Sequence, residues 1–245
     1  MSETITLANV LDDAALLSLE HQLHFAEVVG EHNWSVDLRE QRFEFTGSRN
    51  LTCTRVHLLG SAAPGPQSWL WAWANPTGYP ESLTAASAKV RDFGRQYGIP
   101  ELASAEVPFS ALPGRPADFR LEPARVAAML LDAAKVVSGV WTYYHADVGR
   151  GTRAAFLIEH PEFQLPPPEF PRVIRILQQA VTEAPLTDHR RAIHSYARLR
   201  GLGAAFTPDH SGLTITGPGF TIEAAFDPHG RVSNITAQST PPNAP

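Results

Sequence analysis

The stretch Trp69–Asn75, with the sequence Trp-Leu-Trp-Ala-Trp-Ala-Asn, constrains the fold more than any other part of the chain. Its three indoles recur at every second residue, and side chains alternate between the two faces of a β-strand. A strand therefore places Trp69, Trp71 and Trp73 on one face, whereas a helix would scatter them around its axis. Both faces are apolar, which is typical of a central strand covered on both sides. Pro76 follows, and we expect the strand to end before it.

Other segments show helical or alternating periodicity. Apolar residues recur at helical spacing over about residues 12–29, 84–97, 123–138, 172–184 and 188–200. Alternation over 34–45 and 140–158 predicts two hairpins, and shorter strands are expected over 51–59 and between 204 and 237. Helices and strands come in groups and do not strictly alternate. This predicts an α+β fold with mainly antiparallel sheet, in the order α-ββββ-α-α-ββ followed by a smaller α-α-βββ unit.

Proline marks the expected division of the chain. Five prolines lie between Pro161 and Pro171, which is the clearest linker signal in the sequence. We expect an N-terminal unit over residues 1–160 that carries the Trp strand, a joint over 161–171, and a smaller C-terminal unit over 172–238. Residues 239–245 are expected to form a flexible tail.

Composition excludes several classes of protein. The 245 residues, 43% of them hydrophobic, suffice for one large domain or two small ones with real cores. The formal net charge of −5 argues against nucleic-acid binding. A single cysteine, Cys53, excludes an intrachain disulfide and a multi-cysteine zinc site. No signal peptide and no apolar run of membrane-spanning length is visible, so we expect a cytoplasmic protein without membrane contact.

The sequence shows no catalytic motif and predicts no cofactor and no metal. It lacks a nucleophile elbow, a phosphate-binding glycine loop, a dinucleotide-binding fingerprint and a calcium loop. His21 and His24 lie three residues apart on the first helix without the spacing of a metal-binding pair. His189 and His194 do not share a helix face well, and Glu159-His160 ends the second hairpin.

The Trp strand allows two interpretations. In the first, the indoles fill the core between sheet and helices. In the second, part of the indole face lines a groove for an apolar or extended peptide, because binding sites combine aromatic walls with a few polar groups. The second interpretation gives the following candidate ligand-binding residues: Trp69, Trp71, Trp73, Asn75, Tyr143 and Tyr144.

Basic residues are dense in one stretch of the chain. His189-Arg190-Arg191 begins the last predicted helix, and Arg198 and Arg200 follow near its end. A solvated helix face explains this pattern, and a patch for an anion or an acidic partner is the alternative. The candidate residues for such a patch are Arg190, Arg191 and Arg198.

The Trp stretch also supports a resemblance. Trp-Leu-Trp-Ala-Trp-Ala-Asn, with the upstream Trp34-x-Val36-Asp37-Leu38 segment and the downstream Tyr143-Tyr144 pair, resembles an uncharacterised bacterial family of unknown function that is common in actinobacteria. The resemblance covers roughly residues 12–160 and implies no established activity. The order of elements is more weakly similar to the type III secretion chaperone and YbjN-like fold, whose members bind other proteins and often dimerise.

Together these features favour a non-catalytic module, chaperone-like or adaptor-like, that binds a protein or peptide, with a homodimer as a possible assembly. The alternative is a hydrolase whose His and carboxylate residues the fold assembles. Two or more of His145, His160, His189 and His194 beside an acid in one cleft would favour the enzyme.

Overall fold

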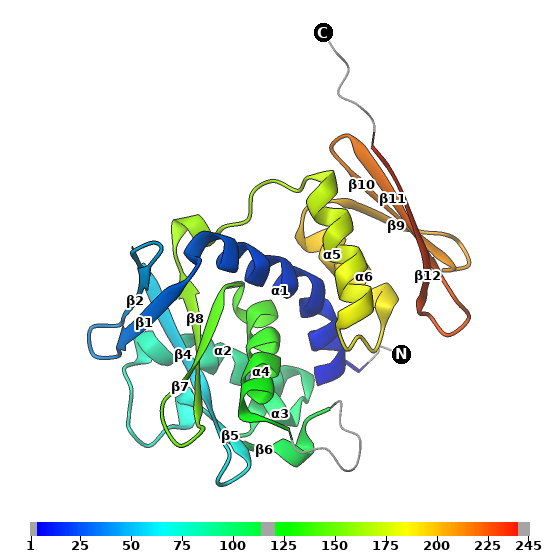
Figure 1. The fold of residues 1–245 in the computed structure, drawn as a ribbon. Helices are drawn as coiled ribbons and strands as arrows, with labels where there is room; N and C mark the ends of the chain where they lie inside the picture. Colours follow the sequence, from blue (N-terminus) through cyan, green and yellow to red (C-terminus); the bar gives the residue numbers. More distant parts are fainter. Residues whose placement is uncertain (1–3, 114–120, 240–245) are drawn as a thin grey trace. The chain divides into compact units, whose positions relative to one another are not determined.

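The computed structural model describes residues 4–113 and 121–239, and it confirms the α+β class (Figure 1). All strand pairs are antiparallel, and they form sheets in the orders β1-β2-β3, β6-β5-β4-β8-β7 and β12-β11-β10-β9. The chain divides into two compact units. One comprises Met1–Val10 and His21–Gln164, and the other comprises Leu11–Glu20 and Leu165–Pro245. The predicted tail residues 240–245 lie outside the described residues, and Ser239 ends strand β12.

The first unit contains the two N-terminal sheets and most of the helices. Its helices are α1 (Leu7–Val29, shared with the second unit), α2 (Glu81–Tyr97), α3 (Pro100–Ala103) and α4 (Pro123–Ser138). Its strands are β1 (His32–Asp37), β2 (Arg42–Gly47), β3 (Leu51–Thr52), β4 (Arg55–Ala63), β5 (Ser68–Trp71), β6 (Glu106–Pro108), β7 (Tyr143–Asp147) and β8 (Arg153–Glu159). Its described residues also form the short 3-10 helices η1 (Ala72–Ala74), η2 (Phe109–Ala111) and η3 (Pro161–Phe163).

The second unit is smaller. It consists of α5 (Phe170–Glu183), α6 (His189–Leu199), β9 (Gly203–Phe206), β10 (Gly212–Gly217), β11 (Phe220–Phe226) and β12 (Val232–Ser239), together with residues 11–20 of α1. Its sheet therefore has four strands where three are expected. The role of residues 161–171 as a joint stays a prediction.

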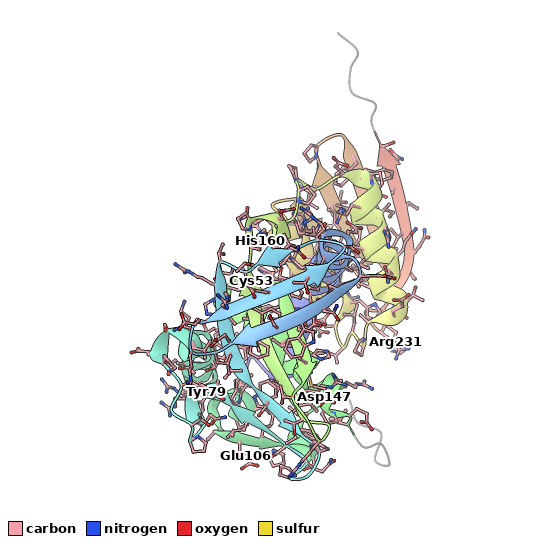
Figure 2. All side chains as sticks on the ribbon, turned by 60° about the vertical axis from the view of Figure 1, so that its left-hand side comes forward. Cys53, Tyr79, Glu106, Asp147, His160 and Arg231 are labelled. Carbon is pink, nitrogen blue, oxygen red and sulfur yellow. The ribbon has the colours of Figure 1, made fainter. Side chains whose placement is uncertain are left out.

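The five-stranded sheet is the middle layer of the first unit. Helix α2 contacts β4, and helix α4 contacts both β4 and β8. One face of the sheet packs against the three-stranded sheet, and in Figure 2 the blue β1–β2 hairpin crosses in front of the green strands. Alternation along β8 explains both contacts, because Phe156 and Ile158 join the core between the sheets while Leu157 faces the helices.

The predicted Trp strand is shorter than expected. β5 ends at Trp71, and residues 72–74 form η1, so Trp73 leaves the face that Trp69 and Trp71 share. Its neighbour β6 pairs only with Ser68–Leu70, so the ladder that would hold a longer strand is missing on that side. The chain turns into η1 instead. The Asn75 N–H closes this helix by donating to the Ala72 carbonyl at 3.2 Å.

Candidate functional site

Strand β1 is an edge whose outer backbone groups can be assigned from the ladder. The Cys53 N–H donates to the Phe43 carbonyl at 2.8 Å, so Phe43 directs its backbone groups toward β3. Because these groups alternate in direction along a strand, Glu44 directs its own toward β1, where it pairs with Ser35. The N–H and C=O groups of Trp34 and Val36 therefore point away from β2. No strand in the described ranges pairs with β1 on that side.

Burial drops sharply from β2 to β1. Phe43 and Phe45 on β2 are both 0% exposed. Their register partners on β1, Val36 and Trp34, lie on the same face and are only partly buried. A strand inside a sheet is covered by neighbours on both sides, and β1 has one neighbour only. The inner face of β1 is thus the incompletely covered margin of the core between the two sheets.

That margin consists of aromatic rings. The ring of Trp34 stacks on Phe43 with centroids 5.9 Å apart and lies 5.8 Å from the ring of Tyr144 on β7. Tyr144 also contacts His32 at 5.8 Å and Phe45 at 5.4 Å. Burial raises the pKa of the Tyr144 hydroxyl, so the ring stays neutral at physiological pH. We call His32, Trp34, Val36 and Tyr144, with the free edge of β1, the β1 edge site.

The turn after β1 fixes this edge. The Asp37 carboxylate accepts hydrogen bonds from the backbone N–H groups of Glu40 and Arg39, at 3.1 and 2.9 Å. These bonds hold the pKa of the Asp37 carboxyl below its usual value. A held four-residue turn sets the register of β1 on β2, and thus the positions of Trp34 and Val36.

Of the sequence-predicted ligand-binding residues, Trp69 and Trp71 lie in the core. Both are 0% exposed, and their rings meet edge to face with centroids 5.2 Å apart. The Trp71 indole N–H donates to the Glu101 carbonyl at 3.1 Å. Trp69 packs so closely on β4 that a Cβ on Gly60 would lie 2.6 Å from its ring, which explains the glycine. Neither indole has surface that a ligand could contact in this structure.

The other predicted residues lie elsewhere. Trp73 is partly buried under the guanidinium of Arg91, which lies 5.3 Å from the ring centroid. The side chain of Asn75 accepts from the Thr77 N–H at 2.9 Å and so serves the local turn. Only Tyr144 belongs to the β1 edge site, and sequence reasoning missed His32, Trp34 and Val36 as site residues. Their alternation with polar residues predicts a strand, but it does not indicate whether that strand lies at the edge or in the middle of a sheet.

Tyr143 points to the opposite face of the sheet, toward helix α4. The fully buried Nζ of Lys135 lies 3.9 Å from the centroid of its ring and donates to the Asp132 carboxylate at 2.9 Å. Burial lowers the pKa of Lys135, and the Asp132 charge opposes this effect. Burial raises the pKa of Tyr143 to about 12. Buried lysines with shifted pKa values are common at functional sites, but ion pairs within a fold also produce them. Here the Asp132 carboxylate pairs with Lys135, so a structural role accounts for the burial.

The lowered pKa of Lys135 makes stability depend on pH. Between the lowered value and the ordinary value of 10.5, the unfolded chain binds the Lys135 proton more readily than the native protein. The free energy of unfolding of the wild type, relative to Lys135→Met, should therefore rise through this window, by about 1.4 kcal/mol for each increase of one in pH. Urea unfolding of both chains at a series of pH values checks this. A pH-independent difference would contradict it.

The three predicted patch arginines lie on α6 in the second unit. Arg191 is paired with Asp13, its Nε donating to the carboxylate at 2.9 Å. Arg190 donates from Nε to the His210 carbonyl at 3.0 Å and covers the ring of Phe226. Arg198 is exposed. Two of the three side chains are therefore engaged within the unit, and the anion patch stays a prediction.

A pocket of about 630 Å³ lies at the N-terminus of α6, lined by Leu186–Arg190 and His229–Arg231. The carboxylate of Asp12 accepts from the N–H groups of Thr187 and Asp188 at 2.9 Å each, and burial raises the pKa of Asp12. The Asp188 side chain caps the helix through the Arg191 N–H at 3.0 Å. Carboxylates of this unit thus occupy part of the donor set that an anion would need.

The described residues show no metal centre and no spanning helix. Across 4–113 and 121–239, no three His, Cys, Asp or Glu side chains are grouped so that they could hold a metal ion. Within the same ranges no helix combines the length and the apolar character needed to cross a membrane. Burial raises the pKa of Cys53 to about 12, so its thiol stays protonated.

The part of the chain that holds the β1 edge site matches the model of a protein family. The model of a family of unknown function, DUF6882, matches residues 8–161. This chain belongs to the DUF6882 family. The match includes the Trp stretch, all of sheets β1-β2-β3 and β6-β5-β4-β8-β7, and the predicted N-terminal unit almost entirely. No curated protein and no solved structure matches the chain.

Membership in DUF6882 confirms the expectation of an uncharacterised family of unknown function. The Trp motif as the family's hallmark, the bacterial source and the similarity to secretion chaperones stay predictions. The DUF6882 match ends at the start of η3, so α5, α6 and the four-stranded sheet lie outside it. Both edge strands that carry site residues, β1 and β7, lie inside it.

Proposed function

We propose that this protein binds an extended segment of a partner polypeptide along the free edge of β1, as a non-catalytic, chaperone-like or adaptor module. The observation that carries the proposal is the step in burial from Phe43 and Phe45, at 0% exposure, to the partly exposed Val36 and Trp34 beside an unpaired strand edge. A strand added there would complete both the ladder and the core margin.

The backbone of β1 would supply affinity. Trp34 and Val36 each present one N–H and one C=O away from β2, and strand addition recruits such groups into new ladder hydrogen bonds. Each bond contributes about 0.5–1.5 kcal/mol net. These bonds do not depend on the partner's side chains, which suits a module that accepts more than one sequence.

The aromatic margin would supply selectivity. Side chains of an added strand that share the face of Trp34 and Val36 would lie about 4.5–5.5 Å from them, measured between Cβ atoms. They would extend the ring contacts that Trp34 makes with Phe43 and Tyr144. The opposite face would meet Asn33, Ser35 and Asp37, which are exposed. The preferred partner therefore alternates apolar and polar residues.

The hydrolase alternative has less support. His145, His160 and His194 contact the rings of Tyr143, Phe163 and Phe206, at 6.0, 5.3 and 5.3 Å between centroids. Among the four histidines named for this alternative, only His189 lines the pocket in the second unit. The described geometry therefore favours binding over catalysis.

The test uses a matched pair of variants at Val36. Peptides are selected from a random displayed library on the immobilised full chain, and their affinities are measured by fluorescence anisotropy. Val36→Pro removes one outward N–H and leaves the β1–β2 ladder intact, because that N–H does not face β2. Val36→Ile keeps the N–H and the apolar, β-branched shape.

We expect selected peptides with alternating apolar residues, an affinity that falls about three- to tenfold in Val36→Pro, and near wild-type affinity in Val36→Ile. Thermal melts of both variants show whether the fold is kept. Equal binding by a folded Val36→Pro chain, or selected peptides without alternation, would refute this site.

A further inference from the structure

Strand β12 is an exposed edge of the second unit's sheet without the usual protection. It runs for eight residues, Val232–Ser239, and none of them is charged or proline. Its side chains are exposed or partly exposed along the whole strand. Sheet edges are normally protected by charge, proline or short length, because unpaired backbone groups attract other strands.

Each of the other edge strands in the described ranges is short, contains proline, or carries a charge that opposes pairing with a second copy of the same strand. β1 and β7 end in Asp37 and Asp147, and β6 contains Glu106 and Pro108. β3 and β9 are uncharged, and they are only two and four residues long. Within residues 4–113 and 121–239, β12 is thus the long edge that lacks every one of these features.

The turn before β11 shows which β12 groups point outward. Pro218-Gly219 closes the β10–β11 hairpin between Gly217 and Phe220, so Phe220 and every second residue after it direct their backbone groups toward β10. The Phe226 N–H, which donates to the Ser211 carbonyl, follows this parity. Thr221 and Glu223 then face β12 and pair with Gln238 and Thr236.

It follows that the N–H and C=O groups of Ile235, Ala237 and Ser239 point away from β11. Ile235 and Ala237 pair with Ala224 and Ile222, whose side chains are buried, so their own side chains share that covered face. The exposed face carries Asn234, Thr236 and Gln238.

We infer that β12 pairs antiparallel with β12 of a second copy, and that the chain forms a symmetric dimer through this edge. A two-fold axis normal to the sheet near Thr236 sets Ile235 of one copy opposite Ala237 of the other. Apolar residues then face apolar residues, and polar residues face polar residues. An uncharged strand brings no like charges together in this arrangement, whereas self-pairing of a charged edge would do so.

The dimer is expected to be weak. One strand pair buries less than the roughly 1,000 Å² typical of a stable interface, so we expect a dissociation constant in the micromolar range. Sedimentation equilibrium of the full chain, at concentrations from below to well above micromolar, should show a reversible monomer–dimer equilibrium.

Matched variants locate the contact. Ala237→Pro removes an outward N–H from each copy and should weaken the dimer about tenfold, whereas Ala237→Val keeps the N–H and should not. Thr236→Lys and Thr236→Glu each set like charges near the axis and should weaken self-association. An equal mixture of these two should restore it as a heterodimer.

Each outcome decides the proposal. A monomeric wild type at the highest concentration overturns it, and so does a dimer that Ala237→Pro leaves unchanged. Circular dichroism shows whether the proline variant is folded. If it is not, the lysine–glutamate mixture still decides, because failure of the mixture to associate more tightly than either variant alone would overturn the β12 pairing.

Discussion

Replacing Trp71 with alanine should lower the free energy of unfolding of the first unit by about 3–5 kcal/mol. The side chain is 0% exposed, its ring packs edge to face on Trp69, and its N–H donates to Glu101. Truncation leaves a cavity that the surrounding sheet and α3 cannot fill, and it removes the donor from the Glu101 carbonyl in a partly buried hydrogen bond. A loss of this size is a large fraction of the roughly 5–15 kcal/mol that stabilises a typical domain.

Trp73→Ala is the matched control for this prediction. Trp73 lies two residues away and is partly exposed under Arg91, so its truncation should destabilise the unit clearly less than that of Trp71. Urea unfolding followed by far-ultraviolet circular dichroism measures both. If Trp71→Ala lost no more stability than Trp73→Ala, the placement of Trp71 in the core would be wrong.

Replacing Glu20 with alanine should destabilise the second unit by a similar amount, about 3–5 kcal/mol. Glu20 is 0% exposed, lies 3.0 Å from Nε of Arg200, and accepts from the Tyr196 hydroxyl at 2.9 Å. Removing the carboxylate leaves a largely buried guanidinium and a buried hydroxyl without this acceptor. Breaking one side of a buried ion pair is far more harmful than replacing both sides.

The double variant Glu20→Leu with Arg200→Met tests this reasoning. It should recover the part of the loss that the unpaired guanidinium causes, since apolar residues replace the ion pair, and it should keep the part that the Tyr196 hydroxyl causes. Glu183→Ala, at an exposed acid on α5 of the same unit, should change stability by less than about 0.5 kcal/mol. Amide exchange across α5 and α6 reports on this unit separately. If the loss of stability in the double variant equalled the sum of the losses in Glu20→Leu and Arg200→Met alone, the pairing of Glu20 with Arg200 would be contradicted.

Local patterns predicted the elements well, and long-range contacts explain what they missed. The alternation of Trp69 and Trp71 correctly placed both indoles on one face, because that face depends only on strand geometry. The end of β5 at Trp71 depends on where the antiparallel strand β6 begins, more than thirty residues later. The inclusion of residues 11–20 in the second unit rests on contacts such as Asp12 with Thr187, separated by 175 residues. No local periodicity carries such information.

The candidate site was predicted only in part, for the same reason. Tyr144 was expected to line a binding site, but together with the three-tryptophan stretch and not with β1. Core and binding surface use the same residue types, so composition cannot separate Trp71 from Trp34. What distinguishes them is the neighbour that β1 lacks, which only sheet order reveals. Likewise, the sequence predicts Arg191 as a residue of an anion patch, whereas in the structure its guanidinium donates to the Asp13 carboxylate, 178 residues away.

The most direct test of strand addition at β1 is amide hydrogen exchange, measured residue by residue with NMR, with and without a selected peptide. In the free protein we expect fast exchange at Trp34 and Val36 and slow exchange at Ser35, whose N–H faces β2. Peptide binding should slow exchange at Trp34 and Val36 and leave Ser35 unchanged. Exchange at Trp34 and Val36 that stays fast in the bound state would contradict the account.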